Sequence, residues 1–491
     1  MKYFKLFLFS LVCNSFFQAQ VGVNTTTIDA SAALEIQYGT SPKGLLTPRM
    51  TTIQKNAILN PADGLMVYDT DLKSFYHYKT GTPGNWVRMN SDVSDRSNYK
   101  RIKSISDLAA EKVGNSYVLK KETYYEINGT ITVDFPIDLN NAYIVGLDAN
   151  EDKLVSSGIL FQGNYGGTIK NLSLVGNSGG TLFSLNGTAT QGGVNAQNLI
   201  FRDCIVQQFA SIGTIQGFGI VFSSVVQYVG NGNGITYNNI TRLLLNNMAW
   251  FGNNGGTFEK FTGTFNLIQK LGGFSDLSAG TFGIDVSSNP VITGDAVLES
   301  VVFTGDTTGA KYVNKYTTGS YPNFYFNNSW NVRSTGIPNE TDANAVGEFS
   351  FDYAVGSGAP TAFNTSSPSN IVKVQGVSSS SNLFRFSTGN TNNKLVYLGK
   401  KKRFFQVTGS ISFQVPKINT YIIYIAKNGT VISQYKIYGR ASAANDIVVL
   451  PLNALVEMST NDSIEVFAQR YSNTNITDDT ILVPNMTLVI K

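Results

Sequence analysis

Acidic side chains in the middle of the chain are the first residues that could carry out chemistry. A polysaccharide lyase needs a base, usually beside a calcium-binding carboxylate cluster, and a glycoside hydrolase needs two carboxylates facing each other across the sugar. The candidates are Asp203, Glu259, Asp276, Asp285, Asp295, Glu299 and Asp306. They form no tight local motif, so we interpret them as charges on turns and strand edges and predict no catalytic residue.

Other residue types that could build a reactive or metal site are scarce. His77 is the only histidine, and its aromatic neighbours favour a packed or half-exposed strand position over a zinc site or a catalytic triad. Cys204 lies in an apolar stretch and is expected to be buried. The stretch from Asp148 begins like an EF-hand loop, but Lys153 replaces its glycine and Ile159 its final glutamate. We therefore predict no metal and no cofactor, while weak calcium binding stays open.

The charge balance argues against nucleic acid as a partner. The 37 basic and 33 acidic residues give a formal net charge of +4, which is too near neutral for a nucleic-acid binder. The one basic run, residues 400–403, is interpreted as a charged strand edge that blocks unwanted pairing. Charged residues make up only 14% of the chain, which suits strands whose exposed rows are Thr, Ser and Asn.

The N-terminus has the pattern of a secretion signal. Lys2 and Lys5 form a short basic region before an apolar stretch, and Ala19 is a small residue suited to precede a cut. We predict residues 1–19 as a signal peptide and Gln20 as the first mature residue. Cys13 is a poor lipid-attachment site because a bulky valine precedes it. No later stretch approaches the ~20 apolar residues of a membrane span, so we expect an extracellular protein at the cell surface.

Short strand-like triplets separated by Gly, Pro and Asn predict a small β-rich module over residues 20–92, with one helical turn near 52–58. Residues 44–51 read Gly-Leu-Leu-Thr-Pro-Arg-Met-Thr, and residues 64–70 read Gly-Leu-Met-Val-Tyr-Asp-Thr. In both motifs this segment resembles the N-terminal module of many exported flavobacterial surface and fibre-like proteins. The resemblance implies an extracellular location and attachment to another outer-surface protein through residues 20–105.

Apolar strands broken by Gly and Asn turns fill residues 105–309, after a linker at 93–104. Related strands recur, and the intervals from Leu172 to Leu199 and on to Leu243 are 27 and 44 residues. These intervals fit one and then two coils of ~20–27 residues. Because one repeat cannot bury its own apolar face, the coils must stack. We predict a right-handed parallel β-solenoid.

Residues 310–370 are irregular, which fits a loose surface connection, but their aromatic residues favour a packed neck between the modules. Residues 371–491 alternate apolar and polar positions, with an Asn-Gly hairpin turn at Asn428, and predict an antiparallel jelly roll. The stretches at 425–432 and 461–466 resemble the trimeric head of tumour-necrosis-factor and complement-like proteins. From about residue 105 onward, the order of motifs also resembles tail-fibre-like proteins of Bacteroidetes phages.

These features predict an all-β, exported, non-catalytic surface fibre or adhesin. We expect a homotrimer, because few charges, no disulfide and many aromatic residues leave apolar surface to bury. The resemblances imply a glycan or surface ligand at the head, and a role in adhesion or gliding is open. A β-solenoid lyase or hydrolase remains an alternative, as does a phage-type receptor-binding tail fibre, against which the export signal argues.

Overall fold

The structure is a computed structural model in which the chain forms two compact units, Met1–Ser97 and Asn98–Lys491. The residues it describes are 20–38, 43–81, 83–89, 98–177, 179–187, 197–305, 312–363, 370–471 and 479–491. The predicted signal peptide with Ala19, the candidate Asp306 and residues 93–97 of the predicted linker lie outside the described residues. No helix in the described ranges is long and apolar enough to cross a membrane.

The first unit contains a two-stranded parallel sheet, one short helix and a four-stranded sheet. Their bounds are β1 (Val21–Val23), β2 (Leu34–Ile36), β3 (Arg49–Met50), α2 (Thr52–Asn56), β4 (Met66–Asp69), β5 (Ser74–Lys79) and β6 (Asn85–Arg88). The helical turn expected near 52–58 is α2. It begins with a capping box, in which the Thr51 hydroxyl accepts from the Gln54 N–H and the Gln54 side chain accepts from the Thr51 N–H.

A buried ion pair joins α2 to β4. Lys55 Nζ lies 2.8 Å from Asp69 Oδ2, and both side chains are buried. Asp69 also accepts hydrogen bonds from the Thr52 hydroxyl and from the backbone N–H groups of Asp71 and Leu72. Burial alone would raise the pKa of Asp69, but Lys55 and these donors outweigh it and hold that pKa at about 2. The pair therefore fixes the helix on the sheet at neutral pH.

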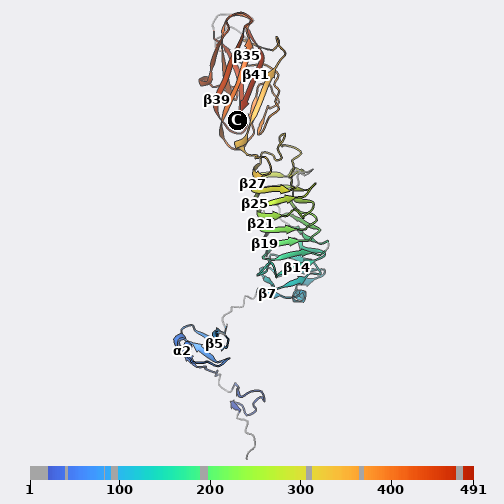
Figure 1. The fold of residues 1–491 in the computed structure, drawn as a ribbon, viewed down its shortest axis with the longest axis vertical. Coiled ribbons are helices and arrows are strands. Elements are labelled where there is room, and N and C mark those ends of the chain that lie inside the picture. Colours follow the sequence, from blue (N-terminus) through green and yellow to red (C-terminus); the bar gives the residue numbers. More distant parts are fainter. Residues whose placement is uncertain are drawn as a thin grey trace, which may run out of the picture. The chain divides into compact units, whose positions relative to one another are not determined.

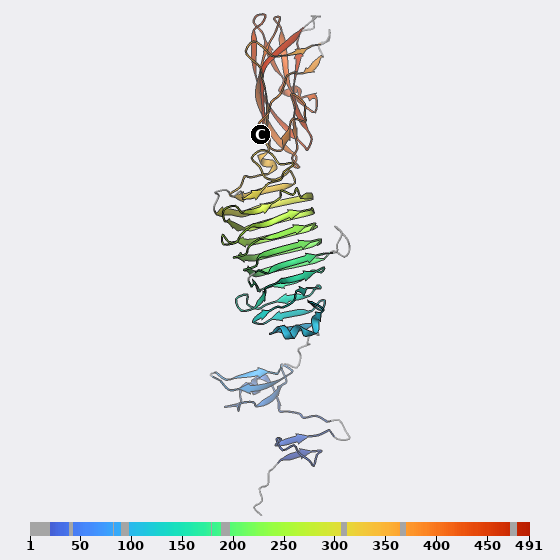
Figure 2. The ribbon, with the colours of Figure 1, turned by 90° about the vertical axis from the view of Figure 1, so that its right-hand side faces the viewer.

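The second unit begins with a parallel β-solenoid, whose stacked strands are labelled from β7 to β27 in Figure 1 and seen from the side in Figure 2. One 13-stranded sheet consists of β7 (Tyr99–Ile102), β10 (Tyr124–Ile127), β11 (Thr130–Thr132), β13 (Tyr143–Val145), β14 (Lys153–Ser156), β16 (Gly167–Lys170), β17 (Ser173–Gly176), β19 (Asn198–Gln207), β21 (Ile220–Val229), β23 (Arg242–Trp250), β25 (Thr264–Leu277), β27 (Val291–Gly305) and β29 (Trp330–Thr335).

The second solenoid sheet has ten strands and alternates with the first along the chain. It consists of β8 (Lys112–Val113), β9 (Ser116–Val118), β12 (Ile137–Asp138), β15 (Ile159–Gly163), β18 (Thr181–Asn186), β20 (Ser211–Gln216), β22 (Ile235–Asn238), β24 (Thr257–Thr262), β26 (Phe282–Asp285) and β28 (Val313–Asn314). A 3₁₀ helix, η1 (Ile105–Glu111), lies before β8. Apart from β8 with β9, the pairings within both sheets are parallel, as a solenoid requires.

The register of the long strands corrects one predicted interval. Leu199, Val221 and Leu243 are aligned on β19, β21 and β23, so the 44-residue interval is two coils of 22 residues. Leu199 is aligned with Gly167, 32 positions earlier, and not with Leu172. The 27-residue interval is therefore not a coil, because the chain between β18 and β19 adds extra residues that a leucine count does not detect.

The solenoid is longer than predicted at both ends. It begins with β7, inside the predicted linker 93–104, and ends with β29, inside the predicted neck 310–370. Two further strands of that neck, β30 and β31, pair with the last strand of the head. The neck is thus shared between the two folds, because irregular connections hide short strands whose partners lie far away in the sequence.

The C-terminal part is an antiparallel sandwich of two sheets. Its strands are β30 (Gly347–Asp352), β31 (Ala359–Ala362), β32 (Ile371–Lys373), β33 (Phe386–Ser387), β34 (Leu395–Tyr397), β35 (Arg403–Gln414), β36 (Thr420–Lys427), β37 (Thr430–Val431), β38 (Ile437–Arg440), β39 (Ile447–Met458), β40 (Ser463–Arg470) and β41 (Thr480–Ile490). Two 3₁₀ helices, η2 (Asp342–Asn344) and η3 (Ser433–Tyr435), complete it.

The strand order of this sandwich is that of a jelly roll. With β30, β32, β33 and β37 left aside, the five-stranded sheet has the order β31-β41-β35-β39 and the seven-stranded sheet the order β34-β40-β36-β38. Counted along the chain as eight strands, these orders are 1-8-3-6 and 2-7-4-5, which form two Greek keys. Asn428 and Gly429 both adopt left-handed φ values in the turn after β36, as a tight hairpin requires. The predicted all-β fold, with a parallel solenoid and an antiparallel jelly roll, is confirmed.

Candidate functional site

The candidate carboxylates of the solenoid are dispersed rather than gathered at one face. Glu259 points into the core, where it is fully buried and lies 3.0 Å from the ammonium group of Lys270. Burial raises the pKa of Glu259, and Lys270 opposes that rise. Asp285 ends β26 and accepts hydrogen bonds from the backbone N–H and the hydroxyl of Ser287. Asp203 pairs with its neighbour Arg202 at 2.8 Å.

The three remaining described candidates lie on two adjacent strands. Asp276 is half-buried on β25, while Asp295 and Glu299 belong to β27. Asp295 is exposed and pairs with Lys400 at 3.1 Å. Glu299 is aligned with Arg333 of β29 at the edge of a pocket of about 280 Å³. The described candidates therefore act mainly in ion pairs and turns.

The stretch that begins like an EF-hand loop is a hydrogen-bonded turn. The carboxylate of Asp152 accepts the backbone N–H groups of Gly129, Leu147 and Asp148 at 2.7–3.0 Å. Burial works in the opposite direction, but these three donors hold the pKa of Asp152 below its usual value. Its oxygens are thus occupied by backbone donors. Within the described residues, no three His, Cys, Asp or Glu side chains come together where they could hold a metal ion.

The histidine and the cysteine lie in different units. His77 is half-buried on β5, opposite Met66 and Val87 in the sheet. Cys204 is buried on β19, and its thiol donates to the carbonyl of Arg202. Burial raises the pKa of Cys204 to about 12, so the thiolate that would make it reactive is strongly disfavoured.

The sequence indicated that the basic run at 400–403 is a charged strand edge. In the structure, only Arg403 of this run lies in a strand, β35. The first residues of the run form the connection between β34 and β35 and reach the solenoid. Lys400 Nζ donates to the carbonyl of Gly294 at 2.7 Å and pairs with Asp295. Lys402 pairs with Glu457 at 2.6 Å. These charges connect the head to the solenoid and brace β39, a role that only the three-dimensional contacts reveal.

A buried polar cluster continues this connection. Arg385 of the head pairs with Asp342 and donates to the carbonyls of Trp330, at 2.6 Å, and Glu340, at 2.9 Å. Asp342 also accepts the backbone N–H of Lys401 at 2.8 Å. Burial raises the pKa of Glu340 to about 7, although its carboxylate accepts two backbone N–H groups. Trp330 belongs to the last solenoid strand, so this cluster fixes the head on the solenoid.

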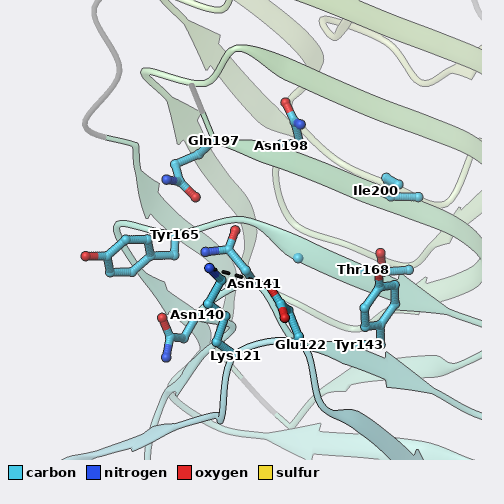
Figure 3. Close-up of a pocket in the computed structure, with 11 residues that line it drawn as sticks. Lys121, Glu122, Asn140, Asn141, Tyr143, Tyr165, Thr168, Gln197, Asn198 and Ile200 are labelled. Carbon is cyan, nitrogen blue, oxygen red and sulfur yellow. Dashed lines mark ion pairs between the residues drawn. The ribbon is translucent and has the colours of Figure 1, made fainter. Parts of the chain in front are cut away.

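A pocket of about 850 Å³ opens on the side of the first solenoid coils. Its walls come from four successive corners at which the chain leaves the ten-stranded sheet or enters the 13-stranded one. Figure 3 shows Tyr165 and Tyr143 at opposite sides, with Asn140, Asn141 and Gln197 between them. The sequence analysis missed this site because its residues are ~20–30 positions apart and form no motif.

Backbone hydrogen bonds hold the pocket corners from coil to coil. The Glu122 N–H donates to the Asn141 carbonyl at 3.3 Å, and the Asn141 N–H donates to the Gly166 carbonyl at 2.8 Å. A Cβ atom on Gly166 would lie 1.8 Å from the carbonyl oxygen of Asn198, so only glycine allows this close approach. The pocket floor is therefore preformed.

The first unit has almost no apolar core of its own. Val67 is its only buried hydrophobic residue among those described, whereas fourteen large hydrophobic side chains are exposed. Leu46, Ile53 and Leu59 are 78–89% exposed. The pair β1–β2 also exposes its apolar side chains, and a two-stranded sheet is marginal alone in water. Such a surface indicates burial against another molecule.

The head has a second apolar surface, on the outer face of the sheet that contains β35, β39 and β41. Ile447, Val449 and Leu455 point outward along β39 and are 55–63% exposed, and Phe404 on β35 is exposed to a similar degree. The inner faces of the same strands pack into the head core. This outer face is the second candidate for self-association.

Comparison with known proteins bears on the N-terminal region. Residues 22–105 match the family model described as phage tail like trimerisation region. The match supports self-association of the chain as a trimer. The sequence analysis had expected residues 20–105 to attach the protein and the head to trimerise. The match falls mainly on the first unit, whose hydrophobic side chains are exposed. No curated protein matches the chain.

Two solved structures are similar over parts of the chain. The Eiger tumour-necrosis factor of S. frugiperda is 7% identical with a TM-score of 0.20, over 30% of this chain and 93% of its own. Tailspike protein 4 of bacteriophage CBA120, in its enzymatically active domain, is 9% identical with a TM-score of 0.27, over 91% and 77%. These scores are low, and the fold described above stands on strand order and register alone.

Proposed function

We propose that this chain is the subunit of a homotrimeric bacterial surface fibre that binds a ligand and does not catalyse a reaction. The observation that carries the proposal is the first unit, which exposes fourteen large hydrophobic side chains and buries one among its described residues. The trimerisation match, over residues 22–105, includes all but the first residues of that unit. Three copies that bury these side chains against one another would supply the core that each copy lacks.

The outer face of the head sheet supports a second trimer contact. Fully burying one Leu, Ile, Val or Phe stabilises an assembly by about 1.5–3 kcal/mol. Ile447, Val449 and Leu455 on β39 and Phe404 on β35 supply four such side chains per copy. Contacts at both ends of the chain would keep three subunits in register, and three copies of a weak ligand site would act together with useful avidity.

Export and attachment complete this proposal. The basic and apolar pattern of residues 1–19 directs the chain outward, and residues 20–105 then also meet another protein of the outer surface. Adhesion or surface motility is the process such a fibre would serve. A phage-type receptor-binding fibre is the second candidate, favoured by the phage-tail description of the matching family.

The location separates these two candidates. Protease added to intact cells should degrade a surface fibre, because the chain would stand outside the cell envelope, while a cytosolic marker enzyme should survive. Immunoblots of shaved and unshaved cells measure this. Full protection of the chain in intact cells, with recovery in the cytosolic fraction, would contradict export and favour the phage-type fibre.

A separate experiment tests the proposal that the chain does not catalyse a reaction. Asp285, Asp295 and Glu299 are engaged in turns or lie beside cations, so we expect the single changes Asp285→Asn, Asp295→Asn and Glu299→Gln to leave ligand binding intact. Viscometry and reducing-sugar release on polysaccharides check for activity. A depolymerase activity that one of these changes abolishes would replace the binding fibre with a solenoid enzyme.

A further inference from the structure

We propose that the pocket between Tyr143 and Tyr165 on the first solenoid coils binds a neutral oligosaccharide. The inference rests on the proposed function as a binding fibre. It adds the chemical class of the ligand and places a ligand site on the solenoid instead of the head.

Exposed tyrosines form an aromatic platform that reaches the pocket, whose lining includes Tyr143 and Tyr165 but not Tyr99 or Tyr124. Tyr99, Tyr124 and Tyr143 are aligned on three successive strands and face outward. The rings of Tyr99 and Tyr124 are stacked at 5.9 Å, and Tyr143 is 46% exposed. Tyr165 is 42% exposed on the opposite side of the pocket. An exposed aromatic face can pack on the C–H face of a sugar ring, while the phenol hydroxyl remains available for hydrogen bonds.

The polar groups of the pocket suit a ligand that carries many hydroxyl groups. The amides of Asn140, Asn141, Gln197 and Asn198 and the hydroxyl of Thr168 line it. Asn140 Nδ2 donates to the carbonyl of Leu119 and Gln197 Oε1 accepts the Gly166 N–H, so these two amides are held in place. An amide offers both a donor and an acceptor, and a hydroxyl does the same, so such a lining can match sugar hydroxyl groups. A volume of about 850 Å³ exceeds what one monosaccharide fills and lies within the usual range for ligand sites.

The charges favour a neutral ligand. Among the described residues that line the pocket, Lys121 and Glu122 are the only charged ones, and their side chains pair at 3.4 Å, marked by the dashed line in Figure 3. The lining therefore has no net charge to attract a uronate, a phosphate or a nucleic acid. The coil-to-coil hydrogen bonds of the corners keep the site preformed, which lowers the ordering cost of binding.

The test uses the full chain on arrays of neutral cello-, xylo-, manno- and chito-oligosaccharides, with oligogalacturonate and a random peptide library as charged and peptidic probes. We expect binding to at least one neutral series. Tyr143→Ala combined with Tyr165→Ala should weaken it about tenfold or more, and the corresponding Phe variant should retain most of it because the rings remain. Tyr438→Ala is the matched control, since Tyr438 is 49% exposed on the head. It should bind like the wild type.

Three results would overturn the inference: no binding to any neutral series, equal binding by the double Ala variant, or a preference for oligogalacturonate or peptide. A fall in particle mass in the double Ala variant would also overturn it, because the tyrosines would then form a contact with a second copy of the chain. Particle mass is measured on the same samples. A trimer that binds no saccharide would refute this inference and leave the trimeric fibre standing.

Discussion

Replacing Lys270 with methionine should lower the stability of the solenoid by about 3–5 kcal/mol, because it leaves the carboxylate of Glu259 buried without its partner. Both side chains are at most 1% exposed, Lys270 Nζ donates to Glu259 Oε1 at 3.0 Å, and Glu259 Oε2 has no hydrogen-bond partner among the described residues. Thermal unfolding of the full chain, followed by circular dichroism, should show a melting temperature lower by roughly 6–20 °C.

The stability lost in Lys270→Met should depend on pH, and it should be smaller at acidic pH. Burial raises the pKa of Glu259, and removing Lys270 raises it further. The folded state then holds a proton that the unfolded state releases, so stability falls as pH rises toward the folded pKa and recovers below the ordinary pKa of glutamate. The deficit of the variant should therefore shrink on acidification.

Two further variants control this experiment. Lys260→Met removes a charge from β24, the strand that carries Glu259. The Lys260 side chain is 44% exposed and 3.9 Å from Asp285, so this change should alter stability little. Lys270→Met with Glu259→Leu removes both buried charges and should recover much of the loss. If Lys270→Met and Lys260→Met melt alike, the buried pair has no such role.

Replacing Leu45, Leu46 and Leu59 together with serine should raise the concentration at which the trimer dissociates by at least about a hundredfold. In one copy these side chains are 66–89% exposed, so the change costs its folding little. In the trimer each buried leucine would contribute about 1.5–3 kcal/mol, which the serines lose. Analytical ultracentrifugation over a dilution series measures the shift.

The matched control is Leu147→Ser, because Leu147 is 71% exposed in a solenoid turn outside the first unit. It should dissociate like the wild type. Equal dissociation of the triple variant and this control would show that the exposed leucines of the first unit do not meet another copy.

Local sequence patterns predicted the strands and turns, whereas the register between coils determines which side chains meet. The stacked Leu199 and Leu243 and the hairpin at Asn428 are visible in the sequence, because each depends on residues a few positions or whole coils apart. The direction in which Glu259 points is not, since the next residue, Lys260, is charged as well and the sequence does not show which of the two faces the core. Its partner Lys270 belongs to the next strand of the other sheet.

Sequence patterns predict even less of the pocket between Tyr143 and Tyr165. Tyr143, Tyr165 and Gln197 belong to three coils and meet only because the corners stack. The extra residues before β19 also break the repeat that would have aligned them. Lys400 reaches Asp295 across 105 positions of sequence, so its role in joining the head to the solenoid could be read only from the folded chain.

Native mass spectrometry of the purified, full-length mature protein tests the central claim most directly. The exposed hydrophobic side chains of the first unit and the trimerisation match on residues 22–105 predict a particle of three chains at micromolar concentration. A well-folded particle with the mass of one chain under those conditions would contradict the trimeric fibre.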